Sequence, residues 1–267
     1  MRHLIHVPDL GPWRLVPGAN DARIRSFAPP ATQWGAVCHV VETPQTIIVV
    51  DPGLPEDMAA ELHGLLLELV LDTPRPVSVF ITHAHADICR AAGPLLADTT
   101  LRATVLCHGL AVTPLASGDA EVTLADDMHL ALPHFPRLTG LFRGHGAIGV
   151  YRSLLTPHGE LEALALPLTN ATALQVYNAP GHTVDSICLR VKGALFTGDL
   201  LASLDDDTAA RTAPGRVAQC PQTLATTAGK MLWIMDNSGV SDVFQSHGPT
   251  LTATEATRRL RTLMATQ

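Results

Sequence analysis

The sequence predicts a mixed α/β fold, and two features of the chain support this prediction. Short runs rich in β-branched residues alternate with segments of helical periodicity, a pattern typical of layered α/β architectures. The chain has 267 residues, of which 46% are hydrophobic, so it can bury a sizeable core without a second domain. We therefore expect residues 1–267 to form a single domain.

Strand and helix alternate in the first half of the chain. Strands are expected at 46–53 and 76–83, with a periodic helix from Glu56 to Leu71 between them. A helical segment from Ile88 to Ala97 and a strand at 103–108 follow. The order strand, helix, strand favours parallel pairing in this half.

The second half continues the same alternation. It contains four more runs with strand composition, at 173–182, 186–193, 194–199 and 240–248. A helical stretch lies between Cys220 and Asn237. A last helix is expected after Thr252, because Thr252 and Glu255 have the spacing of a capping box.

The regular pattern is lost between about Asp126 and Leu168. This stretch is rich in proline, glycine and histidine and shows neither helical nor strand periodicity. A long irregular excursion inside a compact domain is usually a binding loop or a lid. We therefore expect an insertion at about 126–168 that forms a lid or a pocket wall.

Composition excludes several classes of partner. The formal net charge is −7, and only 18 Lys and Arg residues are spread along the chain, so nucleic acid is not an expected partner. No apolar run is long enough to span a bilayer, and the N-terminus lacks an apolar signal core, so we expect no membrane association and a cytoplasmic location. The five cysteines lack CxxC spacing and are expected to be reduced thiols.

Residues able to bind a metal end five of the apolar runs. They are Asp51, His83, His182, Asp199 and His247. Open α/β folds bind ligands outside the carboxyl ends of their strands, so we expect these side chains to gather at one edge of the sheet. The segment His83-Ala84-His85-Ala86-Asp87 adds two more candidates. Imidazole and carboxylate together suit zinc, or iron if coordination positions stay open.

The chain resembles the metallo-β-lactamase superfamily in five motifs that occur in the family's order. They are VVDPG, THAHAD, APGHT, LFTGD and SHGP, spread over roughly residues 35 to 250. The resemblance implies an αββα four-layer sandwich. It also implies one metal site made of His83, His85 and His182, and a second made of Asp87 and His247 with Asp199 bridging the two. Asp51 is expected to orient ligands from behind, a role that suits a carboxylate.

One position departs from the family pattern. The commonest form of the second motif has a histidine directly after the aspartate, where this chain has Ile88, which cannot bind a metal. The second site then keeps three protein ligands, which still suffice for a catalytic zinc. Cys89 is adjacent and is a candidate extra ligand, although a buried cysteine is more often a core residue.

These features predict a metal-dependent hydrolase with one or two Zn²⁺ per chain. A metal-bound hydroxide would attack a small-molecule thioester, lactone, other ester or β-lactam, with Asp87 as both ligand and proton acceptor. The chain contains no GxSxG nucleophile motif. One alternative is a mononuclear iron enzyme resembling persulfide dioxygenases, and another is a non-catalytic binding or sensor protein on the same fold. The sequence does not determine the oligomeric state.

Overall fold

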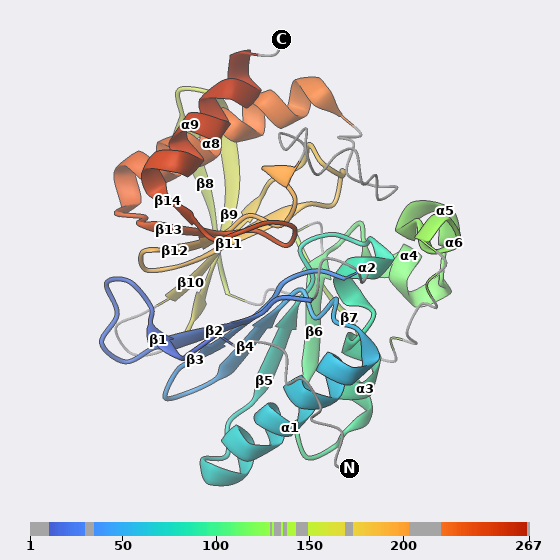
Figure 1. Cartoon of the computed structure of the whole chain (residues 1–267). Helices are drawn as coiled ribbons and strands as arrows, with labels where there is room; N and C mark the ends of the chain where they lie inside the picture. Colours follow the sequence, from blue (N-terminus) through green and yellow to red (C-terminus); the bar gives the residue numbers. More distant parts are fainter. Residues whose placement is uncertain are drawn as a thin grey trace, which may run out of the picture.

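The computed structural model describes residues 11–29, 35–128, 130, 135, 138–142, 149–168, 173–202 and 220–265. Two seven-stranded sheets pack face to face, and helices cover the outer face of each sheet (Figure 1). The predicted α/β class and its αββα four-layer sandwich are therefore confirmed.

The first sheet is built from the N-terminal half of the chain. Its strands, in spatial order, are β1 (Arg14–Leu15), β2 (Arg23–Phe27), β3 (Cys38–Glu42), β4 (Ile47–Val50), β5 (Val77–Phe80), β6 (Thr104–His108) and β7 (Leu138–Leu141). Strands β4 to β7 pair in parallel, and β1 to β4 pair antiparallel. The strands predicted near 46–53, 76–83 and 103–108 are confirmed, whereas β1, β2 and β3 were not predicted.

The second sheet is built from the C-terminal half. Its strands, in spatial order, are β14 (Leu251–Thr252), β13 (Asp242–Phe244), β12 (Ala194–Phe196), β11 (Ile187–Val191), β10 (Ala173–Asn178), β9 (Gly159–Pro167) and β8 (Val150–Thr156). All neighbours pair antiparallel except β12 and β13, which are parallel. Strand β8 therefore forms one end of this sheet.

The helices lie in the outer layers and beside the site. They are α1 (Glu56–Asp72), α2 (Ala86–Cys89), α3 (Ala92–Ala97), α4 (Val112–Ser117), α5 (Ala120–Thr123), α6 (Ala125–Met128), α8 (Pro221–Ser238) and α9 (Ala253–Ala265). The helix expected from Ile88 to Ala97 is divided into α2 and α3. Before α9, the Thr252 hydroxyl accepts a hydrogen bond from the Glu255 amide at 3.3 Å, which is half of the predicted capping box.

Three apolar clusters hold the layers together. The cluster between the sheets joins Ile48 and Phe80 of the first sheet to Val176 and Leu189 of the second. A second cluster packs the buried face of α1 against the first sheet, and a third packs α8 and α9 against the second sheet. Each strand in the middle of a sheet is thus buried on both faces, which explains its nearly continuous apolar sequence.

The stretch at about 126–168 is not irregular throughout, and its role as a lid or pocket wall stays a prediction. Strand β7 completes the first sheet, and β8 and β9 form a hairpin in the second sheet. The hairpin escaped prediction because five of the seven β8 residues are exposed, so its sequence lacks the apolar–polar alternation of a half-buried strand. Residues 129, 131–134, 136–137 and 143–148 of the stretch lie outside the described residues.

None of the helices in the described ranges could span a lipid bilayer. The cytoplasmic location stays a prediction.

Candidate metal centre

The predicted metal-binding residues lie where strands end at one edge of the two sheets. Asp51 follows β4, and His83 follows β5, its parallel neighbour. Asp199 and His247 follow β12 and β13, which are also parallel neighbours. His182 lies in the loop after β10. Topology thus collects at one edge residues that are up to about 200 positions apart in the sequence.

Two glycines allow the loops of this edge to approach one another. A Cβ atom at Gly53 would lie 1.8 Å from the backbone oxygen of Asp87. A Cβ atom at Gly198 would lie 2.7 Å from the Thr82 hydroxyl, and Gly198 has a φ of +55°. The DPG and TGD motifs therefore need glycine because larger residues would push the loops apart.

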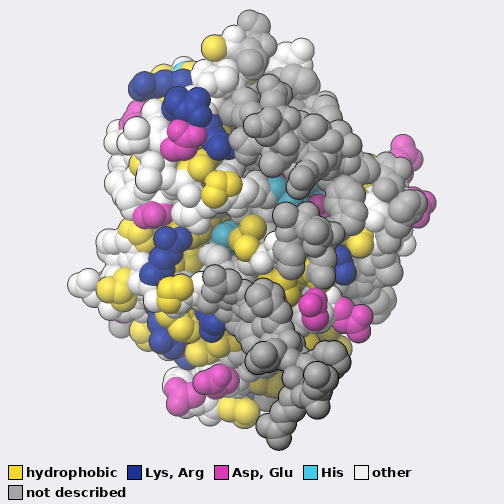
Figure 2. Space-filling view, viewed as in Figure 1, with side chains coloured by type: hydrophobic (Ala, Val, Ile, Leu, Met, Phe, Trp, Pro, Cys, Tyr) yellow, Lys and Arg dark blue, Asp and Glu magenta, His cyan; other side chains and the backbone are white. Residues whose placement is uncertain are grey.

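Three buried imidazoles form the centre of the site. The candidate ligand atoms of His83, His85 and His182 lie within 4.8 Å of one another. His83 Nε2 is 3.0 Å from His85 Nδ1, and the three rings meet nearly at right angles. Figure 2 shows histidine side chains near the middle of this face, between the two halves of the molecule.

Asp199 connects this histidine group to a second one. Its Oδ2 atom lies 3.5 Å from His83 Nε2 and 3.6 Å from His182 Nε2. Its Oδ1 atom lies 2.9 Å from His247 Nδ1, and His247 Nε2 lies 3.1 Å from Asp87 Oδ2. The structure therefore brings all six predicted ligands together, with Asp199 between the two halves of the site.

The charge states differ between the two halves. Burial lowers the pKa of each clustered histidine, to about 4 for His182, so these imidazoles are neutral near pH 7 and keep a lone pair. Burial also lowers the pKa of His247, but Asp199 and Asp87 raise it to about 10. Burial raises the pKa of Asp199, but His247 and the neighbouring histidines hold it well below its ordinary value.

Within the described part of the chain, several buried polar atoms of the site have no hydrogen-bond partner. They are His85 Nε2, His182 Nδ1, His182 Nε2 and Asp87 Oδ1. An unpaired buried polar group costs about 1–3 kcal/mol, and so it needs an explanation. Neutral imidazole nitrogens that converge with carboxylate oxygens are the donor set that zinc and related divalent ions bind. The residues present therefore fit a metal.

Asp51 supports the site from behind. Its carboxylate accepts hydrogen bonds from the Thr82 amide and hydroxyl, both at 2.8 Å, and from the Ser246 hydroxyl. The Thr82 hydroxyl also lies 3.1 Å from His83 Nδ1. Because that hydroxyl donates its single proton to Asp51, it accepts from His83 Nδ1, which leaves His83 Nε2 free to bind a metal.

Asp185 is a buried residue of this edge that the sequence reasoning missed. Its Oδ2 atom accepts a hydrogen bond at 2.9 Å from the amide of Ala84, the residue between His83 and His85. It thereby joins the loop after β10 to the loop after β5. The sequence offered one signal for its role: it is an aspartate two residues after the GHT motif, in a run of otherwise small or apolar residues.

The two residues after Asp87 point away from the ligands. Ile88 and Cys89 are fully buried in the cluster that packs α1 against the first sheet. The Cys89 thiol lies 3.5 Å from the His85 backbone oxygen, and burial raises its pKa well above the ordinary value. These contacts are those of a core thiol, and a ligand role for Cys89 stays a prediction.

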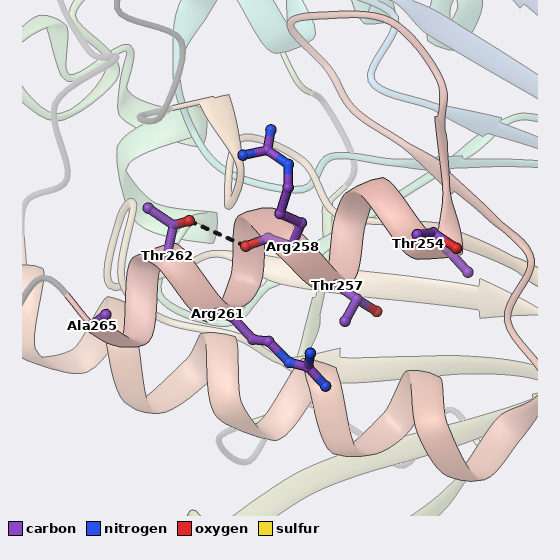
Figure 3. Close-up of a pocket in the computed structure, with 7 residues that line it drawn as sticks. Thr254, Thr257, Arg258, Arg261, Thr262 and Ala265 are labelled. Carbon is purple, nitrogen blue, oxygen red and sulfur yellow. Dashed lines mark hydrogen bonds between the residues drawn. The ribbon is translucent and has the colours of Figure 1, made fainter.

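A separate surface hollow lies on the outward face of α9 (Figure 3). Threonine and arginine side chains line it, including Thr254, Thr257 and Arg261. None of its lining residues belongs to the histidine site. Its remaining arginine, Arg258, is exposed and paired with Glu255 at 2.8 Å. All of its lining residues are exposed or half-buried, so no buried polar group among the described residues lines it.

Comparisons with known proteins agree with this architecture. A metallo-β-lactamase from Pontibacter korlensis is 16% identical, with a TM-score of 0.58, and the match covers 96% of this chain and 100% of the other. The crystal structure of VMB-1 is 14% identical, with a TM-score of 0.56 and coverage of 95% and 97%. At these identities the likeness concerns the fold.

A search of curated proteins finds no match. The family model described as the metallo-beta-lactamase superfamily matches residues 31–240, most of the chain and all six candidate ligands except His247. This match, the fold and the histidine cluster support a metal-dependent, hydrolase-like function. The chain belongs to the metallo-β-lactamase superfamily.

Proposed function

We propose that the protein is a zinc-dependent hydrolase that cleaves a thioester, lactone, other ester or β-lactam of a small molecule. One observation carries the proposal: the buried imidazoles of His83, His85 and His182 bring candidate ligand atoms within 4.8 Å of one another beside the Asp199 carboxylate. Among the described residues, nitrogens of two of these imidazoles have no hydrogen-bond partner. Such an arrangement is costly unless a cation completes it.

His83, His85 and His182 would hold one zinc, and Asp87 with His247 would hold a second, with Asp199 between them. When bound, zinc lowers the pKa of a coordinated water to about 7, which supplies a nucleophile at neutral pH, and it polarises the attacked carbonyl. Asp87 Oδ1 has no hydrogen-bond partner among the described residues, so it would be available to accept a proton from the attacking water and to orient that water.

The position of Ile88 bears on the number of metals. Its side chain lies in the apolar core, so the ligands proposed for the second half of the site are Asp87, Asp199 and His247. Three protein ligands and one solvent molecule form a common catalytic zinc site. We therefore propose two zinc ions, the second bound more weakly than the first.

The first experiment is elemental analysis of the purified, untagged protein, followed by assays on a thioester, a lactone and a β-lactam. We expect zinc in the protein and turnover of at least one class, lost on chelation and restored by Zn²⁺. A matched sample of the His63→Ala variant serves as control, because His63 contacts Asp98 on the surface rather than the site.

The metal content also decides between two chemistries. His83, His182 and Asp199 form a two-histidine, one-carboxylate set, with the carboxylate 3.5 and 3.6 Å from the two imidazoles. This is the ligand set of mononuclear iron oxygenases. One iron per chain, with oxygen consumption on thiol substrates and no hydrolysis, would replace the hydrolase proposal with an iron oxidoreductase.

A further inference from the structure

Strand β8 exposes an apolar edge that the metal site does not explain. It is the last strand of the second sheet, and among the described residues no strand pairs with its outer edge. Tyr151 is 53% exposed and Leu155 is 86% exposed. Proteins normally protect such an edge with proline, a bulge or several charges, but this seven-residue strand carries only Arg152.

The hairpin geometry determines which backbone groups face outward. Only Pro157 and His158 connect Thr156 to its partner Gly159, so this pair closes a two-residue hairpin loop. The pair that flanks such a loop is of the hydrogen-bonded kind, and hydrogen-bonded pairs alternate with non-hydrogen-bonded ones along an antiparallel ladder. It follows that the N–H and C=O groups of Tyr151, Ser153 and Leu155 point away from β9, toward the free edge.

The side chains at this edge are arranged symmetrically about Ser153. Tyr151 lies two residues before it and Leu155 two residues after it, and all three side chains share one face of the strand. If a second β8 pairs antiparallel with Ser153 opposite Ser153, the outward backbone groups meet in register. Each Tyr151 then contacts the other copy's Leu155, an aromatic–aliphatic cross-strand pair.

We propose that β8 is a homodimer interface, in which two copies join their second sheets edge to edge through a two-fold axis at Ser153. The self-complementary spacing favours a second copy of this chain over another protein, because one strand supplies both members of each apolar pair. The interface includes none of the proposed metal ligands, so it is independent of the proposed function.

The test measures the mass of the full-length protein by analytical ultracentrifugation over micromolar concentrations. We expect twice the mass of one chain for the natural sequence. The Tyr151→Lys, Leu155→Lys double variant should be monomeric, because each lysine would meet a lysine across the axis. Leu71→Lys, at an exposed position (71%) at the end of α1, is the matched control and should remain dimeric.

Cross-linking tests the register. Ser153→Cys should form an intermolecular disulfide on mild oxidation, whereas Val150→Cys should not, because two copies of residue 150 would lie about 20 Å apart. Far-UV circular dichroism checks that each variant is folded. A monomeric natural protein, a folded lysine double variant that stays dimeric, an open-ended oligomer, or equal cross-linking at positions 150 and 153 would overturn the proposal.

Discussion

Two regions of the molecule bury histidine in different ways. His39 lies between the sheets, and both of its nitrogens have partners: Ser26 Oγ at 2.8 Å and the Gln245 backbone oxygen at 3.2 Å. His85 and His182 are equally buried at the edge of the sheets, yet they leave three nitrogens unpaired. The difference teaches that burial alone does not identify a binding site, whereas unpaired buried nitrogens that converge do.

The largest effect is expected from removing one of the unpaired imidazoles. The His85→Ala variant should lose the metal of the three-histidine group, with a fall in metal affinity of more than about 100-fold and loss of turnover. Removing a residue that only orients a ligand lowers metal affinity by about 10- to 100-fold, and removing the ligand itself should lower it further. Metal content by elemental analysis and the rate of hydrolysis measure this. A His85→Ala protein that keeps both metal and activity would end the metalloenzyme proposal.

The next effect concerns the support behind the ligands. Asp51→Asn should weaken metal binding by about 10- to 100-fold while keeping the fold, because it disturbs the Thr82 contact that orients His83. Competition with a chromogenic chelator measures the affinity. Asp98→Asn, at a surface carboxylate that pairs with His63, is the control and should bind metal like the natural protein.

His39 predicts a pH effect on stability rather than on metal binding. Burial lowers its pKa from 6.5 to about 4, so below pH 6.5 the unfolded chain binds a proton that the folded chain does not. The stability from neutral His39 is complete above pH 6.5 and is lost as the pH falls toward 4. Between pH 7 and 4.5 the natural protein should lose about 2–3 kcal/mol more than His39→Gln.

Urea unfolding of the metal-free proteins at several pH values measures this difference. The other titrating groups are the same in both proteins, so their contributions cancel when the two unfolding free energies are subtracted. The remaining difference reports on His39. If His39→Gln lost its metal, the distinction between the two regions would fail.

The smallest effect is expected at Cys89. Cys89→Ser should leave metal content and turnover unchanged and lower the stability by about 1 kcal/mol, because a hydroxyl replaces a thiol in an apolar cluster. Metal analysis and thermal unfolding measure the two properties separately. A loss of metal in a protein of normal stability would instead make Cys89 a ligand.

The sequence by itself predicted the α/β class, the middle strands of both sheets and the residues that meet at the site. These features follow from local signals: apolar runs buried on both faces, and polar groups placed directly after them. The parallel strands β4, β5 and β6 were predicted for the same reason. The helices α1, α8 and α9 were predicted from other local signals, namely helical periodicity and the capping-box spacing before α9.

Only the tertiary structure decided the rest, because it depends on contacts distant in sequence. Ser246 reaches Asp51 across 195 positions, and Asp185 reaches Ala84 across 101, and no local pattern indicates either contact. Cys89 lies only two residues after Asp87 in sequence, but its position in α2 turns its thiol into the core. Strand β8 lacks a periodic signal because it lies at the end of a sheet, where packing does not select an apolar face.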